Sequence, residues 1–165
     1  MADNDGYQKG TLIMRALYPL AHNQVYTVNT TKATKTIFSG KTANGLPSGF
    51  TQSDVLKARI ILNIAYLNRY NGANDLDLTT ATDNQFKVQV NSGGFTTMLD
   101  GQMSDGDWEV DQQNAGGNLT LSLDVTSLLS DITTDTFDAE HENAVSDQNS
   151  FKVIVDAWLE VYWQR

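Results

Sequence analysis

The chain contains no cysteine, only two prolines, and few basic residues among its 165 amino acids. Without cysteine, disulfides, thiolate metal sites and a cysteine nucleophile are excluded. Eleven Lys and Arg against twenty Asp and Glu give a net charge of -9. This charge argues against a nucleic-acid partner, because phosphate neutralisation needs clustered basic residues. No apolar run approaches the roughly 20 residues of a membrane span, so no membrane partner is expected.

The first ten residues are polar and acidic, without the apolar segment of a secretory signal peptide. We therefore expect synthesis in the cytosol. The composition is rich in Thr, Asn, Gly and Asp, which is typical of strands joined by polar turns. No linker or internal repeat divides the chain. The sequence predicts an N-terminal arm at residues 1–9 and a single β-sandwich domain at residues 10–165.

Two long segments alternate between apolar and polar residues with a period of two, which predicts β-strands. One face of the first carries Leu56, Ala58, Ile60, Leu62, Ile64 and Tyr66. One face of the second carries Phe151, Val153, Val155, Ala157, Leu159, Val161 and Trp163. The opposite face of the second is mixed, because Ile154, Trp158 and Tyr162 stand there among charged residues. We expect this last strand to be covered on both sides over part of its length.

Shorter alternating runs fill the rest of the chain. Residues 11–18 and 24–28 are predicted to be a pair of strands, with Pro19 and His22-Asn23 in the connection. Further strands are predicted over residues 34–38, 86–90 and 119–125, and Gly and Asn turn residues separate the runs. A short helical turn is expected near Ser127, capped by Asp124 or Thr126. Seven or eight strands without a long helix predict an all-β, antiparallel, jelly-roll-like sandwich.

Two acidic loops are predicted, over residues 100–117 and 131–149. In the first, Asp105, Asp107, Glu109 and Asp111 alternate along the chain, and clustered carboxylates are ligands that calcium prefers. The EF-hand pattern fails, because its sixth position requires Gly and is occupied by Val110. The alternative is an amphipathic strand with an acidic exposed face. Apart from calcium at these four residues, no cofactor is expected.

Few residue patterns in the sequence could form a catalytic site. His22 is expected in a turn and His141 in the second acidic loop, and neither is accompanied by a nucleophile motif. Carboxylates that could serve glycoside hydrolysis fall in predicted loops rather than on rigid strands. We therefore interpret both histidines as surface residues and expect the chain not to be an enzyme. A small glycan hydrolase is the least favoured alternative.

The apolar residues on the outer face of the last strand are Ile154, Trp158 and Tyr162. If this row is exposed, it is an interface with another subunit or an aromatic platform for a ligand. The alternative is a second covered face. We predict that these three residues form a subunit contact.

Three segments resemble jelly-roll domains of the carbohydrate-binding-module type. The segment at residues 55–62 resembles their x-K-A-x-L-x-L strand, and residues 123–129 resemble their D-V-T-x-L-V strand and turn. The segment at residues 157–162 resembles their closing P-x-L-E-V-x-Y strand, although Ala157 stands in place of the proline. These motifs imply the fold, but they identify no sugar-binding residue in this chain.

The chain also resembles, in general style, the small jelly-roll structural proteins of bacteriophages. This resemblance implies a non-catalytic virion structural protein, specifically a capsid decoration (cement) protein, made in the host cytoplasm and located in the virion. Its partners would be the major capsid protein or other virion proteins, contacted by the N-terminal arm and the two acidic loops, and symmetric virion sites imply a homotrimer. The alternative is a carbohydrate- or receptor-binding module of a phage tail or a cell-surface assembly.

Overall fold

The structure, a computed structural model, describes residues 13–28, 33–43, 51–68, 84–98, 116–143 and 151–164. These residues form eight strands and two single turns of 3-10 helix. The strands are β1 (Ile13–Val28), β2 (Ala33–Thr42), β3 (Val55–Asn68), β4 (Asn84–Val90), β5 (Thr96–Thr97), β6 (Gly116–Asp124), β7 (Thr136–Asn143) and β8 (Phe151–Gln164). The helical turns are η1 (Gln52–Asp54) and η2 (Thr126–Leu128). The predicted N-terminal arm and most of the first acidic loop lie outside the described residues.

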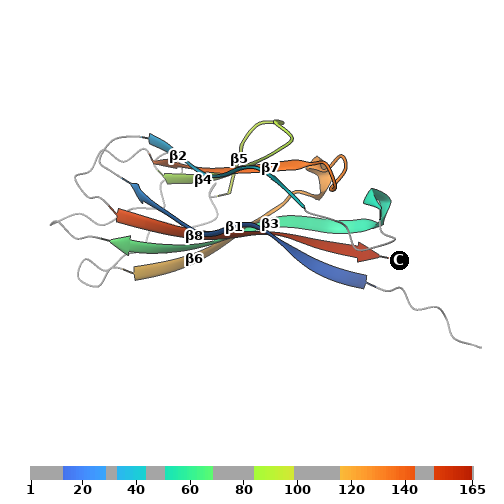
Figure 1. Cartoon of the computed structure of the whole chain (residues 1–165), viewed down its shortest axis with the longest axis horizontal. Helices are drawn as coiled ribbons and strands as arrows, with labels where there is room; N and C mark the ends of the chain where they lie inside the picture. Colours follow the sequence, from blue (N-terminus) through green and yellow to red (C-terminus); the bar gives the residue numbers. More distant parts are fainter. Residues whose placement is uncertain are drawn as a thin grey trace, which may run out of the picture.

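The strands form two four-stranded antiparallel sheets that pack face to face (Figure 1). We call the sheet with the order β1-β8-β3-β6 the β8 sheet, and the sheet with the order β2-β7-β4-β5 the β7 sheet. With the exception of β5, successive strands alternate between the two sheets, which is the connectivity of a jelly roll. The predicted all-β sandwich is therefore confirmed, and its strand order is that of a jelly roll.

The core lies between the two sheets and follows the predicted alternation. On β8, the side chains of Val153, Val155, Ala157, Leu159, Val161 and Trp163 have no exposed area. On β3, Ala58, Ile60, Leu62 and Ile64 are also buried. From the β7 sheet, Phe86, Val88, Val90, Phe137 and Ala139 complete the core. The two long alternating segments thus became two neighbouring strands of one sheet, as their period predicts.

The prediction of a strand pair at residues 11–28 is wrong, because residues 13–28 form the single strand β1. Both of its halves pair with β8, and the register shifts at Pro19–Gln24. Asp156 of β8 holds this bulge: its Oδ1 accepts hydrogen bonds from the Asn23 backbone N–H at 2.8 Å and from His22 Nδ1 at 2.9 Å. Asn23 has a φ of 47°, which Asn tolerates better than most residues. The polar residues that predicted a connection therefore form a β-bulge.

The second predicted loop, residues 131–149, is also partly wrong, because residues 136–143 form β7 at the centre of the other sheet. His141 is consequently not a surface residue. It lies in the core with no exposed area, stacked on Phe86 at a centroid distance of 4.3 Å. The Tyr26 hydroxyl of β1 lies 3.1 Å from His141 Nδ1, so this pair joins the two sheets across the core.

Two smaller predictions had different outcomes in the structure. Leu56, predicted to share the buried face of its strand, is 46% exposed, because the register shifts between Val55 and Lys57. The helical turn near Ser127 is confirmed as η2, but the predicted cap is wrong, because the N-cap is Val125. The Asp124 carboxylate instead accepts a hydrogen bond from the Thr126 backbone N–H, inside the turn, at 3.0 Å. This turn follows β6 and closes one end of the sandwich.

Burial of His141 makes the stability of the fold pH-dependent. Burial lowers the pKa of His141 from 6.5 to about 4, so the imidazole stays neutral in the folded state while the unfolded chain is protonated as the pH falls. The unfolded state then binds more protons, and the free energy of unfolding should drop by about 2 kcal/mol between pH 7 and pH 5. Chemical denaturation at both pH values measures this drop.

The variant His141→Phe should abolish most of the drop, because Phe does not titrate. Tyr26→Phe is the matched control: it removes the hydroxyl next to the imidazole but keeps the histidine, so the drop should persist. An unchanged pH dependence in His141→Phe would contradict the assignment.

Candidate interaction surface

The side of the β8 sheet that faces away from the core is the candidate site, and we call it the outer face. Among the described residues, no strand packs on it. Three large apolar side chains of β1 stand out there: Ile13 is 59% exposed, Leu17 48% and Val25 58%. The outer face therefore combines extended strands with apolar side chains in contact with solvent. Apolar surface of this kind is a mark of an interaction site when it is contiguous.

The predicted contact residues Ile154, Trp158 and Tyr162 all lie on the outer face and are half-buried. The strand register aligns Ile154 and Trp158 with apolar residues of the neighbouring strands, and Tyr162 with Arg15 and Lys57. Trp158 lies between Pro19 of β1 and Ile61 of β3, and Ile154 lies between Val25 of β1 and Ala65 of β3. Two apolar rows thus cross three strands. Ile154, Trp158 and Tyr162 thus share this face, and their role as a subunit contact stays a prediction. The β1 part of the face was not predicted, because residues 11–18 and 24–28 were expected to be two separate strands.

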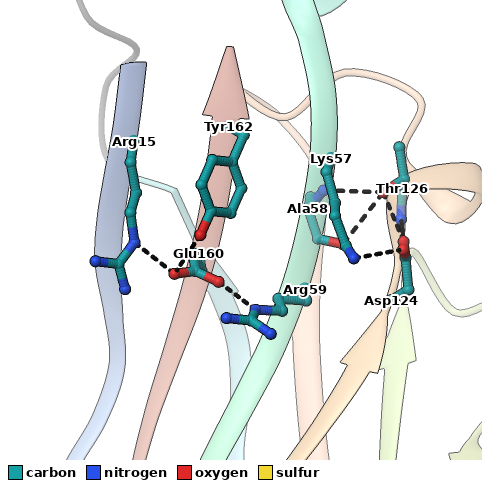
Figure 2. A network of polar contacts seen from close by, with 8 residues as sticks. All are labelled: Arg15, Lys57, Ala58, Arg59, Asp124, Thr126, Glu160 and Tyr162. Atoms are coloured by element: carbon teal, nitrogen blue, oxygen red, sulfur yellow. Dashed lines mark hydrogen bonds and ion pairs between the residues drawn. The ribbon is translucent and has the colours of Figure 1, made fainter. Parts of the chain in front are cut away.

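Between Trp158 and Tyr162, the outer face carries a carboxylate that is fully covered by its neighbours. Glu160 has no exposed area. Its Oε1 accepts hydrogen bonds from Arg15 Nε at 2.5 Å and from the Tyr162 hydroxyl at 3.2 Å, and its Oε2 accepts one from Arg59 Nε (Figure 2). The three donors come from β1, β8 and β3. The carboxylate therefore ties the three strands together from the side opposite the core.

The electrostatics of this cluster keep Glu160 ionised. Burial raises the pKa of Glu160, but the hydrogen bonds from Arg59, Arg15 and Tyr162 outweigh it, so that the pKa lies below its usual range. Glu160 in turn raises the pKa of Arg59. Two guanidinium groups share one carboxylate, so the cluster carries an excess of one positive charge. Arg15 and Arg59 are still 55% and 37% exposed, and this charge is open to solvent.

The edge of the outer face at β6 is polar. Thr120, Ser122 and Asp124 are exposed there, and Lys57 of β3 lies 3.7 Å from the Asp124 carboxylate (Figure 2). Hydrogen bonds from the Thr126 hydroxyl and backbone N–H lower the pKa of Asp124, so this carboxylate also stays charged. The apolar part of the outer face is therefore centred on β1, β8 and β3, with a polar rim on one side.

On the opposite surface of the sandwich, the outward positions of β7 and β4 are polar. Its β7 residues are Asp138, Glu140 and Glu142, and Glu142 forms an ion pair with Lys87 of β4. These carboxylates were predicted in a loop, and they lie instead on a central strand. The outward face of β7 and β4 is therefore polar, whereas the outer face of the β8 sheet is partly apolar.

A groove of about 440 Å³ lies where β1 and β2 run close together. Its floor is formed by Leu20, Ala21, Ile37 and Phe38, and its rim by His22, Gln24, Ser39 and Lys41. Both strands bulge here. Asp138 holds the β2 bulge as Asp156 holds that of β1, by accepting hydrogen bonds from Ser39 Oγ at 2.6 Å and from the Gly40 backbone N–H at 2.8 Å.

The predicted calcium residues Asp105, Asp107, Glu109 and Asp111 lie outside the described residues, so calcium binding stays a prediction. Within the described part of the chain, no group of three or more acidic or histidine residues is arranged to hold a metal ion. None of the helical segments there is long and apolar enough to cross a membrane. His22 is exposed in the β1 bulge, where its Nε2 lies 3.0 Å from Asn23 Nδ2.

Replacing the central carboxylate should destabilise the domain. Glu160→Gln leaves Arg15 and Arg59 side by side without a counter-charge, and we expect a loss of about 1 to 2 kcal/mol in the free energy of unfolding at neutral pH. Glu140→Gln, the same change on the outer surface of the β7 sheet, should cost less than about 0.5 kcal/mol. Denaturant titration of both variants measures the difference.

The destabilisation should also depend on pH. Because the folded-state pKa of Glu160 lies below the value of 4.5 for an unperturbed Glu, the carboxylate stabilises the fold fully above pH 4.5, and this contribution is lost as the pH falls through the lowered pKa. The gap between wild type and Glu160→Gln should therefore narrow in acid. A gap that stays constant down to pH 3 would show that the charge of Glu160 is not the cause.

Comparison with known proteins assigns the chain to no family. No protein-family model matches the chain, and no curated protein matches it. Among solved structures, the chain is similar to one described as "Structure of infectious bursal disease virus Gx strain", with a TM-score of 0.42 and 10% sequence identity. The similarity covers 92% of this chain and 32% of that chain, so this chain spans about a third of the length of the structure that it matches.

Proposed function

We propose that the chain is a non-catalytic structural protein of a virus particle, and more specifically a bacteriophage capsid decoration protein that sits on the shell in several copies. The observation that carries this proposal is the outer face. A jelly roll whose interior is filled by its own core presents, on one side, apolar rows around Trp158 and Ile154 that no described strand covers. Such a surface supports assembly with other protein subunits.

Two further features support a structural role. Jelly rolls are a common fold of viral shells and of lectins. The jelly-roll fold of this chain therefore supports a structural role by analogy. In addition, the lowered pKa values of Glu160 and His141 have structural causes. The carboxylate of Glu160 joins three strands, and the imidazole of His141 fills the core against Phe86. Neither group needs a catalytic role to explain its environment.

The proposal is tested on virus particles from a culture that produces this protein. Particles are separated on a density gradient, probed with an antibody raised against the chain, and labelled with gold for electron microscopy. We expect the protein to sediment with the particles and the gold to lie on the capsid shell. Antibody pre-adsorbed with the pure protein is the control. Protein that stays at the top of the gradient, away from all particles, would refute a virion role.

A second candidate function is a carbohydrate- or receptor-binding module. The observation that favours it is that Trp158 and Tyr162 lie on the same open face of one strand, where planar rings can stack on a sugar. A glycan array, read with and without a calcium chelator, separates the two functions. A decoration protein should bind no glycan in either condition, whereas a lectin-like module should bind a defined set, and should lose it on chelation if the predicted calcium residues take part.

A further inference from the structure

The charges of the outer face are unevenly distributed along the strands. One end, which we call the cationic end, carries Arg15 of β1 together with Lys57 and Arg59 of β3. Among the described residues of these strands, the carboxylates at this end are Glu160 and Asp124, so the three cations exceed them by one charge. This excess lies on a chain whose net charge is -9.

On the far side of the Trp158 row, Asp156 of β8 lies beside Asn63 of β3. Asp156 uses one oxygen to hold the β1 bulge, and its side chain is 29% exposed. The apolar row of Pro19, Trp158 and Ile61 separates it from the cationic end, and the apolar row of Ile154 follows it. Along the strands, the face is thus cationic, then apolar at Trp158, acidic at Asp156 and apolar again at Ile154.

We propose that the outer face pairs with the outer face of a second copy of this chain. The two copies are related by a twofold axis that lies between their β8 sheets, runs perpendicular to the strands and passes through the Trp158 row. Trp158 then faces its own copy, and Asp156 of one copy faces the Glu160 cluster of the other, whose two guanidinium groups exceed its one carboxylate. In this isologous arrangement every contact occurs twice. A twofold axis along the strands would instead bring the two cationic ends together, which like-charge repulsion disfavours.

The size of the face suits a weak dimer. Four strands about 4.8 Å apart, over the nine residues from Ile154 to Tyr162 at about 3.4 Å each, give a footprint on the order of 500 Å². Stable interfaces bury about 800 Å² per partner, and smaller ones are usually transient. We therefore expect dissociation in the micromolar range. Two sheets packed in this way would lie about 10 Å apart, with their strands nearly aligned.

The pairing rests on the outer face alone and does not depend on the virion role. It also replaces the homotrimer expected from the sequence with a dimer, because a twofold axis closes with two copies. Its experiments use the purified full-length chain, so that their result is independent of the gold-labelling of particles.

The first experiment is sedimentation equilibrium of two variants matched in residue type and exposure. Leu17 lies on the outer face and is 48% exposed, and Leu128 lies in η2 at the end of the sandwich and is 46% exposed. Leu17→Ser should raise the dissociation constant of the dimer about tenfold or more, since the lost apolar contact occurs twice. Leu128→Ser should leave it unchanged. Circular dichroism confirms that both variants are folded.

The second experiment tests the orientation of the pair. Across an axis at Trp158, Asn63 of one copy faces Arg59 of the other, because the two residues lie on β3 at equal distances on either side of that row. Asn63→Lys should therefore weaken the dimer and Asn63→Asp should strengthen it. General charge repulsion predicts the reverse, because the Lys variant is less negative overall. The two mechanisms therefore predict opposite changes in the dissociation constant for each variant.

Three results would overturn the proposal. A wild-type chain that remains monomeric up to about 0.5 mM would exclude the pairing, since micromolar association would be saturated there. A trimer would exclude the twofold arrangement. A dimer that Asn63→Lys strengthens would exclude the proposed orientation. A dimer that Leu17→Ser and Leu128→Ser weaken equally would exclude the outer face as the contact surface.

Discussion

Pairing of β8 with β1 on one side and β3 on the other determines the β8 sheet. These pairings extend over nearly the full length of β8, from Phe151 to Gln164. Because side chains alternate along a strand, the same residues that place Trp163 and Leu159 in the core also place Glu160 and Trp158 on the outer face. A slip of one residue would exchange the two faces, and would bury Glu160 without Arg15 or Arg59 beside it. Core packing and the Glu160 cluster therefore stabilise the same register from opposite sides.

Regular alternation explains what could be predicted from the sequence. The buried faces of β3 and β8, the sandwich class and the turn at η2 all follow from local patterns of apolar and polar residues. Irregular backbone explains what could not be. Leu56 is exposed because of a register shift, and the polar residues His22 and Asn23 belong to a bulge rather than a turn. A bulge and a hairpin use the same residue types, so composition alone does not separate them.

The candidate site shows a second limit, which is that long-range partners are invisible in a single sequence. Glu160 looked like an ordinary polar position on a mixed face, and its partners Arg15 and Arg59 lie 145 and 101 residues away. Likewise, His141 appeared to be a loop residue because Glu140 and Glu142 flank it. Alternation along β7 nevertheless turns those two carboxylates outward and the imidazole inward, against Phe86 and Tyr26. Only the strand order brings such groups together.

The position of β8 in the sheet also bears on how the chain folds. Ile13, the first residue of β1, pairs with Gln164, so β1 has no neighbour in its own sheet until β8 has been synthesised. Before that point, a nascent chain lacks the strand that lies between β1 and β3. Pairings between residues this distant in sequence form slowly, because loop closure must precede them. We therefore expect the β8 sheet to assemble after translation of its last strand, as a late step that exposes the chain to aggregation until it is complete.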